Sequence, residues 1–373
     1  MGSGESTKRL GATTLLARGL TPGKLRGLQR ISNPDGTLTM LALDQNSSVI
    51  EMAAQALRAS GEDRQPTYDE IVDVKLDLMR NLAPAASGVL IDAYYGAWSA
   101  IASEAIPPGT GLLVRYEMSS CPKNTLGAPL AAVEPGWSVE KIKLMGADAV
   151  KLLVQFEPTE PASAEHQFQM VDYVHSECKR YDILMLLETY SFPWGGERKK
   201  SPAYLERKGR TAIESARLLS PFCDIYKTEF PGTMGVEPEG RHLDNLRALD
   251  SVSQRPWVLL SAGVDYHDYM RQVELAMAAG ASGILGGRAF WKEYFEEPAG
   301  QARTQFAATT ARSRLAEVDA LVRARGTPWF ARYGLSREEL GTIRAAEGWH
   351  IRYASGGPSP APVAVAPAPG DVY

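Results

Sequence analysis

The chain has 373 residues, of which 44% are hydrophobic and 23% are charged, and its formal net charge is −4. This length can bury the core of one large domain or of two smaller ones. The charge balance creates no global basic field, which argues against a nucleic-acid partner and against binding to anionic lipid.

The three cysteines, Cys121, Cys178 and Cys223, show neither CxxC spacing nor a neighbouring histidine cluster. This pattern disfavours a disulfide framework and a zinc site, and it favours a reducing compartment. No run of eighteen or more apolar residues is present, and the first thirty residues lack an apolar core followed by a cleavage site. We therefore expect a cytoplasmic protein with no membrane partner.

Short apolar runs recur along the chain after the mixed, glycine-punctuated residues 1–30. Each run carries a polar residue at or near its C-terminal end, and the spacing between runs is typical of βα units. The runs predict eight strands, over residues 38–44, 88–94, 111–117, 149–156, 183–189, 224–230, 257–264 and 283–290.

Helical patterns lie between the predicted strands. In residues 68–82 the side chains of Ile71, Val74, Leu78 and Leu82 share one face. Start and stop signals predict further helices over residues 138–145, 211–219 and 267–279, and after the last strand over 301–325 and within 328–353.

Eight parallel strands that alternate with helices predict an α/β protein with a (β/α)8 TIM barrel. The alternative is an open doubly wound sheet, but no GxGxxG or GxxxxGK[ST] motif follows a predicted strand. We expect residues 1–30 to form an N-terminal extension that caps the barrel floor and residues 31–325 to form the barrel. Residues 326–354 would form a helical extension, and the Pro/Ala-rich residues 355–373 a disordered tail.

Three charged residues interrupt apolar strands: Lys151, Glu188 and Lys227. A buried ammonium is costly unless its pKa falls or an opposite charge meets it. The residues are about one βα unit apart, so they would lie on consecutive strands. Strand alternation would direct them into one cavity at the C-terminal end of the barrel.

This set of residues suits a Schiff-base active site. The attacking amine of Lys227 must be neutral, and burial beside a second cation, Lys151, would favour that state. Glu188 could carry protons to and from the intermediates. The alternative is a purely structural Lys-Glu-Lys ion-pair network.

Two loops near the C-terminal end suit a phosphate group. Ser261 and Gly263 follow the seventh predicted strand, and Gly287 and Arg288 follow the eighth, where TIM barrels often bind phosphate. The alternative is that these are ordinary turn glycines. Asp44 closes the first strand, where it could anchor the second lysine or a substrate hydroxyl, or cap the following helix.

Residues 37–292 resemble the class I tagatose 1,6-bisphosphate aldolases and the related sulfofructose-phosphate aldolases. The resemblance rests on six short segments in a shared order: Leu43-Asp44-Gln45, Gly146 to Leu153, Leu187-Glu188, Tyr226 to Glu229, Leu260 to Val264, and Gly287-Arg288-Ala289.

The resemblance implies that Lys227 is the Schiff-base lysine and Glu188 the proton-transfer group, with Lys151 and Asp44 as polar support. It further implies a substrate-binding set of Gln45, Ser261, Gly263, Gly287 and Arg288, the last four around the phosphate of the dihydroxyacetone half. The family cleaves a ketohexose bisphosphate to dihydroxyacetone phosphate and glyceraldehyde 3-phosphate without a metal, so we expect neither metal nor cofactor.

The chain departs from the family after Asp44-Gln45, where the family usually has an arginine and this chain has Asn46-Ser47-Ser48. The far end of the substrate is therefore open. Residues 194–200 could supply replacement cations or form a solvated loop.

Tagatose 1,6-bisphosphate is the first substrate hypothesis, ahead of fructose 1,6-bisphosphate and 6-deoxy-6-sulfofructose 1-phosphate. A barrel that only senses a sugar phosphate is the alternative from another functional class. The sequence leaves the oligomeric state open, with a homo-oligomer as one alternative.

Overall fold

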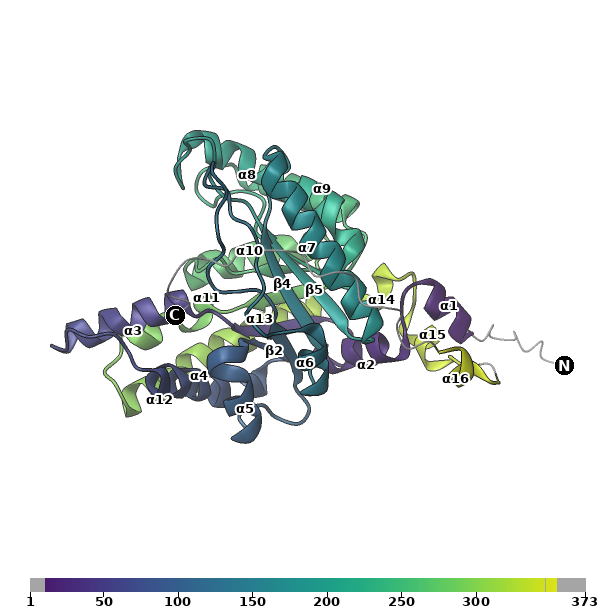
Figure 1. The fold of residues 1–373 in the computed structure, drawn as a ribbon, viewed down its shortest axis with the longest axis horizontal. Coiled ribbons are helices and arrows are strands. Elements are labelled where there is room, and N and C mark those ends of the chain that lie inside the picture. Colours follow the sequence, from purple (N-terminus) through teal and green to yellow (C-terminus); the bar gives the residue numbers. More distant parts are fainter. Residues whose placement is uncertain (1–10, 346, 354–373) are drawn as a thin grey trace.

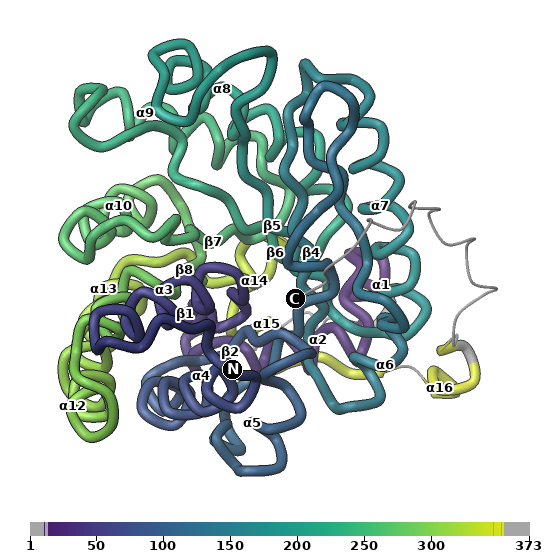
Figure 2. The backbone as a smooth tube through the Cα atoms, turned by 60° about the vertical axis from the view of Figure 1, so that its left-hand side comes forward, coloured from purple at the N-terminus to yellow at the C-terminus, as the bar shows by residue number. Residues whose placement is uncertain are grey.

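The computed structural model describes residues 11–345 and 347–353. Its centre is a closed barrel of eight parallel strands in the order β1 to β8, surrounded by helices (Figure 1, Figure 2). This confirms the predicted TIM barrel over the open sheet. The strands are β1 Leu38–Leu43, β2 Gly88–Ile91, β3 Gly111–Arg115, β4 Ala149–Gln155, β5 Leu184–Tyr190, β6 Ile225–Thr228, β7 Trp257–Leu260 and β8 Gly283–Gly286.

The strands lie where the sequence predicts them, but several end earlier. β7 ends at Leu260, whereas the predicted strand continues to Val264. The residues between leave the ladder because Ala262 and Gly263 have φ values of +48° and +73°, which a strand does not accommodate. The early ends create the rim loops on which the predicted phosphate residues lie.

The helices on the outside of the barrel have recognisable starts. The Thr67 side chain and Glu70 form a capping box at α4, and Ser138 caps α6 as its sequence predicts. These helices and turns are α3 Ser47–Ala59, α4 Tyr68–Leu82, η1 Ala83–Ala85, η2 Ala93–Ala97, α5 Trp98–Ala102, α6 Val139–Leu144, α7 Pro161–Arg180, α8 Pro202–Leu219, η3 Ser220–Phe222, α9 Glu239–Val252, α10 Tyr266–Ala279, α11 Arg288–Trp291 and η4 Lys292–Phe295.

Some helix predictions need correction. The predicted helix 211–219 is the second half of α8, which begins after Ser201 with Pro202 in its first turn. The predicted helix 301–325 is interrupted by a π-helical turn, and the described residues of the predicted helical piece within 328–353 form three short helices. These elements are α12 Gln301–Phe306, η5 Ala307–Ala311, α13 Arg312–Arg325, α14 Trp329–Arg332, α15 Arg337–Gly341 and α16 Trp349–Arg352.

Buried apolar side chains form two cores. The larger lies between the strands and the surrounding helices. The smaller fills the lower barrel with inward-facing residues such as Leu113 and Leu186, and the terminal segments close it from below. α1 (Ala12–Ala17) contributes Leu15, α2 (Pro22–Ile31) contributes Leu28, and α14 contributes Trp329. The first helices therefore pack at the floor of the barrel, opposite the rim.

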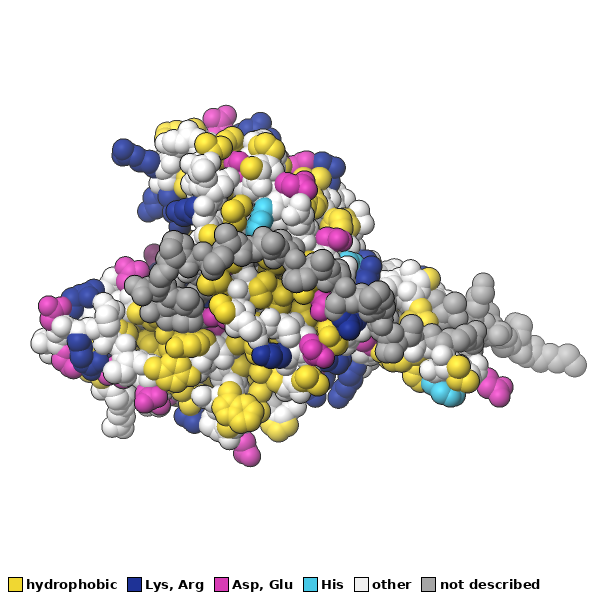
Figure 3. Space-filling model, viewed as in Figure 1, with side chains coloured by type: hydrophobic (Ala, Val, Ile, Leu, Met, Phe, Trp, Pro, Cys, Tyr) yellow, Lys and Arg dark blue, Asp and Glu magenta, His cyan; other side chains and the backbone are white. Residues whose placement is uncertain are grey.

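The division into an extension, a barrel and a C-terminal helical segment stays a prediction, and the predicted disordered tail over residues 355–373 lies outside the described residues. Figure 3 shows one face, where hydrophobic side chains gather over α4 and α5. Trp98, the first residue of α5, is 75% exposed. Within 11–345 and 347–353, no helix has the length and apolarity required to cross a membrane.

Candidate active site

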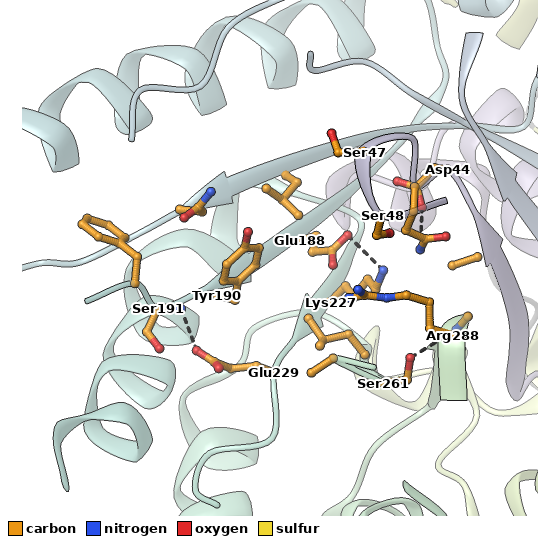
Figure 4. Close-up of a pocket in the computed structure, with 18 of the residues that line it drawn as sticks. Asp44, Ser47, Ser48, Glu188, Tyr190, Ser191, Lys227, Glu229, Ser261 and Arg288 are labelled. Carbon is orange, nitrogen blue, oxygen red and sulfur yellow. Dashed lines mark hydrogen bonds and ion pairs between the residues drawn. The ribbon is translucent and has the colours of Figure 1, made fainter. Parts of the chain in front are cut away.

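The carboxyl ends of the strands surround a cavity of about 650 Å³. The predicted residues that line it are Asp44, Gln45, Lys151, Glu188, Lys227, Ser261, Gly287 and Arg288. Figure 4 shows Glu188 and Lys227 together at its centre, with Ser261 and Arg288 to one side. Gly263 lies behind this surface, where an added Cβ would be 3.2 Å from the Arg288 guanidinium carbon. The structure thus brings the predicted site together.

Lys227 points from β6 into the cavity and is 3% exposed. Its Nζ donates a hydrogen bond of 2.9 Å to Oε2 of Glu188, which lies directly across on β5. The next residue back, Tyr226, faces the outer core. Strand alternation therefore places the lysine inside the barrel and its neighbour outside.

The Glu188 carboxylate lies between two lysines. The same Oε2 atom that accepts from Lys227 is 3.2 Å from Nζ of Lys151. The three charged residues predicted from the sequence therefore form one contact chain.

Lys151 is the centre of the buried charge cluster. Its Nζ donates to Asp44 Oδ2 at 2.8 Å and to Glu117 Oε1 at 2.6 Å. Burial by itself would lower the pKa of Lys151, but the carboxylates of Asp44, Glu117 and Glu188 together raise it above the ordinary lysine value. Lys151 is therefore a permanent cation beside Glu188.

Asp44 belongs to this cluster and does not cap a helix. Burial alone would raise its pKa, but the positive charges of Lys151, Lys227 and Arg115 lower it well below the usual range. Helix α3 is instead preceded by Asn46. Of the predicted alternatives for Asp44, the geometry supports the anchor of the second lysine.

Sequence reasoning missed two residues of the site, Arg115 and Glu117. Both line the cavity from the end of β3, and Glu117 also accepts a hydrogen bond from the backbone N–H of Leu153. They follow Leu113 with the two-residue period of a strand. The same alternation rule that selected Lys151 would have placed them inside the barrel.

A further buried lysine, besides Lys151 and Lys227, adjoins the site. Lys75 of α4 is 1% exposed and forms an ion pair with Asp92, and it also donates to Leu43 O and to Asn46 Oδ1. Burial lowers the pKa of Lys75, against the opposing effect of Asp92. Its sequence signal is its position on the apolar stripe of α4.

The two predicted phosphate loops touch each other. The Gly287 N–H donates to Ser261 Oγ at 3.3 Å, which joins the loop after β7 to the loop after β8. A Cβ on Gly287 would lie 2.5 Å from the Ala42 carbonyl oxygen, so the close approach to β1 requires glycine. Arg288 adds a guanidinium beside this turn.

The loop over residues 194–200 reaches the mouth of the cavity. Lys199 and Lys200 line it and are exposed, so the cation and solvated-loop interpretations both describe part of the structure. Lys208 of α8 also lines it, 3.4 Å from Glu229 Oε2.

Comparisons with solved structures agree with the barrel. An archaeal fructose 1,6-bisphosphate aldolase superimposes with a TM-score of 0.52 at 17% identity, over 81% of this chain and 99% of that one. Fructose-bisphosphate aldolase from Slackia heliotrinireducens gives a TM-score of 0.57 at 15% identity, over 86% of this chain and 92% of that one. At these identities the likeness shows the fold.

Sequence comparisons are more specific. Tagatose 1,6-diphosphate aldolase from Listeria monocytogenes is 29% identical over 337 residues, which cover 84% of this chain and 96% of the relative. The enzyme of that name from Staphylococcus epidermidis is 28% identical over 327 residues, 82% of this chain and 97% of the relative. The model of the DeoC/LacD aldolases matches residues 38–293, the whole barrel from β1 to β8. The chain belongs to the DeoC/LacD family of aldolases.

Proposed function

We propose that this aldolase works through a Schiff base on Lys227 and cleaves a ketohexose bisphosphate. The observation that carries the proposal is the contact of Lys227 with Glu188, and of Glu188 with Lys151, inside the cavity at the barrel rim. An amine, a proton-transfer carboxylate and a fixed cation are the groups that iminium chemistry requires.

In the forward reaction, Lys227 passes a proton to Glu188 and its free amine attacks the C2 carbonyl of the open-chain ketose. Proton transfers through Glu188 let the carbinolamine lose water and form the iminium. The iminium accepts the electron pair of the C3–C4 bond when a base removes the C4 hydroxyl proton, and the aldehyde leaves. Protonation of the enamine at C3 and hydrolysis then release dihydroxyacetone phosphate and regenerate the amine.

Lys151 and Asp44 support these steps. Because Lys151 stays charged, it holds the Glu188 carboxylate in place beside Lys227. Asp44 in turn holds Lys151.

The phosphate at C1 would bind at the paired loops after β7 and β8. Ser261 would contribute its hydroxyl group and Arg288 its guanidinium group to the phosphate. Gly287 has no side chain, so its backbone would come close to the phosphate. Gly263 leaves space for the Arg288 guanidinium. Gln45, whose Nε2 donates to Asp44 Oδ1, would contact the substrate from the β1 side.

The preferred substrate is tagatose 1,6-bisphosphate, with glyceraldehyde 3-phosphate as the second product. The names of the Listeria and Staphylococcus relatives support this choice. Fructose 1,6-bisphosphate and 6-deoxy-6-sulfofructose 1-phosphate are the alternatives, since residue types do not fix the direction of one hydroxyl.

A cytoplasmic location and self-association remain part of the proposal. The three cysteines are free thiols, which suits a reducing compartment. The partner we propose is a small sugar phosphate, with no metal or cofactor. Full activity in the presence of a chelator is the expected result.

Trapping the intermediate tests the proposed function. Wild-type protein incubated with dihydroxyacetone phosphate and borohydride should gain one covalent adduct, which peptide mass analysis places on Lys227. Lys227→Arg keeps the charge but lacks the nucleophilic amine, so it should form no adduct and lose nearly all turnover. Tight binding of dihydroxyacetone phosphate without a covalent adduct would instead favour a barrel that only senses a sugar phosphate.

A further inference from the structure

We propose that Arg115 and Asn46 bind an anionic group at the far end of the ketose, on the β1–β3 side of the cavity. This inference rests on the proposed function, because it assigns the second end of a substrate whose first end occupies the Ser261 and Arg288 loops.

Arg115 is a buried cation with unused hydrogen-bond donors. It is 6% exposed and lines the cavity. Among the described residues, its guanidinium donates from Nη1 to the Asp44 backbone oxygen and forms no ion pair, and its Nε has no acceptor. A guanidinium carries five N–H donors, and a charge removed from water without a partner is costly. An anion in the cavity would supply the missing partner.

Asn46 presents a second unused donor, and Lys75 fixes its orientation. Lys75 Nζ lies 2.8 Å from Oδ1 of Asn46, and an ammonium can only donate, so the amide oxygen must face the lysine. The Nδ2 group therefore faces away, where it is buried and meets no acceptor within the described chain. Asn46 is 2% exposed and lines the same cavity as Arg115.

The start of α3 adds further donors at this place. The helix has 13 residues, and the Asn46 side chain does not cap its first backbone N–H groups. Ser47 and Ser48 of this first turn line the cavity. Free N–H groups at a helix start favour a negative charge. The Asp44 carboxylate already accepts hydrogen bonds from Lys151 and Gln45.

The lysines at the mouth of the cavity, Lys199, Lys200 and Lys208, are weaker candidates for binding the distal anion. Lys199 and Lys200 are exposed, so solvent already satisfies them, and Lys208 has Glu229 and the Gly232 carbonyl oxygen as partners. In contrast, Arg115 is buried, and among the described residues it forms no ion pair, although its charge also acts on the nearby Asp44 and Glu117 carboxylates. Arg115 ends β3, Lys227 lies in β6 and Arg288 begins α11 after β8, and these strands are two or three apart around the closed barrel. A ketose held at both ends would therefore cross the Lys227 amine.

The ligand group is a tetrahedral oxyanion, either phosphate or sulfonate. Two variants test it: Arg115→Gln removes the cation, and Asn46→Asp keeps the shape and an oxygen for Lys75 while it replaces the donor with a negative charge. The matched control is Arg58→Gln, which makes the same charge change at the exposed far end of α3. Steady-state cleavage is measured with tagatose 1,6-bisphosphate, 6-deoxy-6-sulfofructose 1-phosphate and tagatose 1-phosphate.

Arg115→Gln and Asn46→Asp should each raise the KM by roughly tenfold or more, as expected for a lost charge-assisted hydrogen bond. This rise should appear with whichever of tagatose 1,6-bisphosphate and 6-deoxy-6-sulfofructose 1-phosphate the wild type cleaves better. The KM for tagatose 1-phosphate should change by less than about threefold, because its single anion binds elsewhere. Arg58→Gln should match the wild type. Which of the two distal-anion substrates responds identifies phosphate or sulfonate as the natural group.

Adduct formation with dihydroxyacetone phosphate separates this inference from the proposed function, since that ligand has no distal anion. Absence of the adduct in the wild type would refute the Schiff-base proposal. An adduct in all variants together with an unchanged preference for the distal anion would overturn the subsite alone. Loss of that preference in a Lys199→Gln, Lys200→Gln double variant would also overturn it. If Arg115→Gln does not fold, the KM values of Asn46→Asp alone test the distal-anion subsite.

Discussion

At the scale of single residues, the site depends on charges that balance only as a group. Lys151 is 2% exposed and contacts three carboxylates, those of Asp44 after β1, Glu117 after β3 and Glu188 in β5. Buried ion networks contribute little net stability, yet removal of one partner leaves the others uncompensated. The cluster is thus better explained by a need for fixed charges at the cavity than by stabilisation of the fold.

Lys151→Met should lower the free energy of unfolding by about 3–5 kcal/mol and abolish most turnover, because three carboxylates lose their shared cation. Chemical denaturation and steady-state kinetics measure the two effects. Lys179→Met, at an exposed position on α7, is the control and should stay within about 0.5 kcal/mol of the wild type. Unchanged stability of Lys151→Met would mean that the carboxylates do not need this cation.

The stability of Lys151→Met relative to the wild type should also depend on pH, in a direction that the charge of Asp44 sets. Neighbouring cations lower the pKa of Asp44 in the folded protein. The ionised Asp44 carboxylate therefore contributes its full share to the free energy of unfolding at pH values above about 3.9, the pKa of aspartate in the unfolded chain. This contribution is lost as the pH falls below that value. The stability gap between wild type and Lys151→Met should accordingly be widest above about pH 5 and narrow toward pH 3. A gap that widens in acid would contradict the charge assignment.

At the scale of elements, the sequence predicts the strands and many of the residues that line the cavity, but it misses those at the end of β3. Lys151, Glu188 and Lys227 stand out because each interrupts an apolar run. Arg115 and Glu117 do not stand out, because a polar residue at the end of a barrel strand is common. Their importance depends on closure of the barrel, which brings β3 beside β4 and the start of α3.

Lys75 illustrates the same limit for helices. A lysine on a helix whose neighbours include charged residues normally points to solvent. Here it belongs to the buried stripe, because Asp92 at the end of β2 and Asn46 before α3 provide partners from elsewhere in the chain. Sequence spacing gives the stripe but not these partners.

The rim loops allow an element-scale prediction. Gly287→Ala would place a Cβ 2.5 Å from the Ala42 carbonyl oxygen, so the loop after β8 must move away from β1. The KM should rise by roughly tenfold for tagatose 1,6-bisphosphate and tagatose 1-phosphate alike, because both place a phosphate in this loop. This common rise differs from the selective effect expected for Arg115→Gln.

The control for this substitution is Gly109→Ala, where an added Cβ meets no atom within 4 Å. It makes the same chemical change away from the rim and should leave both KM values unaltered. If Gly287→Ala binds both substrates normally, the loops after β7 and β8 do not hold the C1 phosphate.

At the scale of the whole molecule, the barrel separates its floor from its reactive rim. The inner core below the site is closed by α2 and α14, with Trp329 1% exposed. The Tyr333 hydroxyl donates to the Asp224 carbonyl oxygen, and the buried Asp224 carboxylate pairs with Lys24 of α2 at 2.9 Å. Both terminal segments are thus tied to the start of β6, the strand that carries Lys227 at its other end.

This arrangement predicts that damage to the floor costs stability without changing substrate binding. Trp329→Ala should lower the free energy of unfolding by about 3–5 kcal/mol, because a large side chain leaves a cavity in the inner core. The KM and kcat of the folded fraction should stay within about twofold of the wild type, since the strands still present the rim residues. Trp349→Ala, at a position 42% exposed, should cost less than about 1 kcal/mol. A rise in KM for Trp329→Ala with unchanged stability would instead show that the terminal segments act on the site through β6.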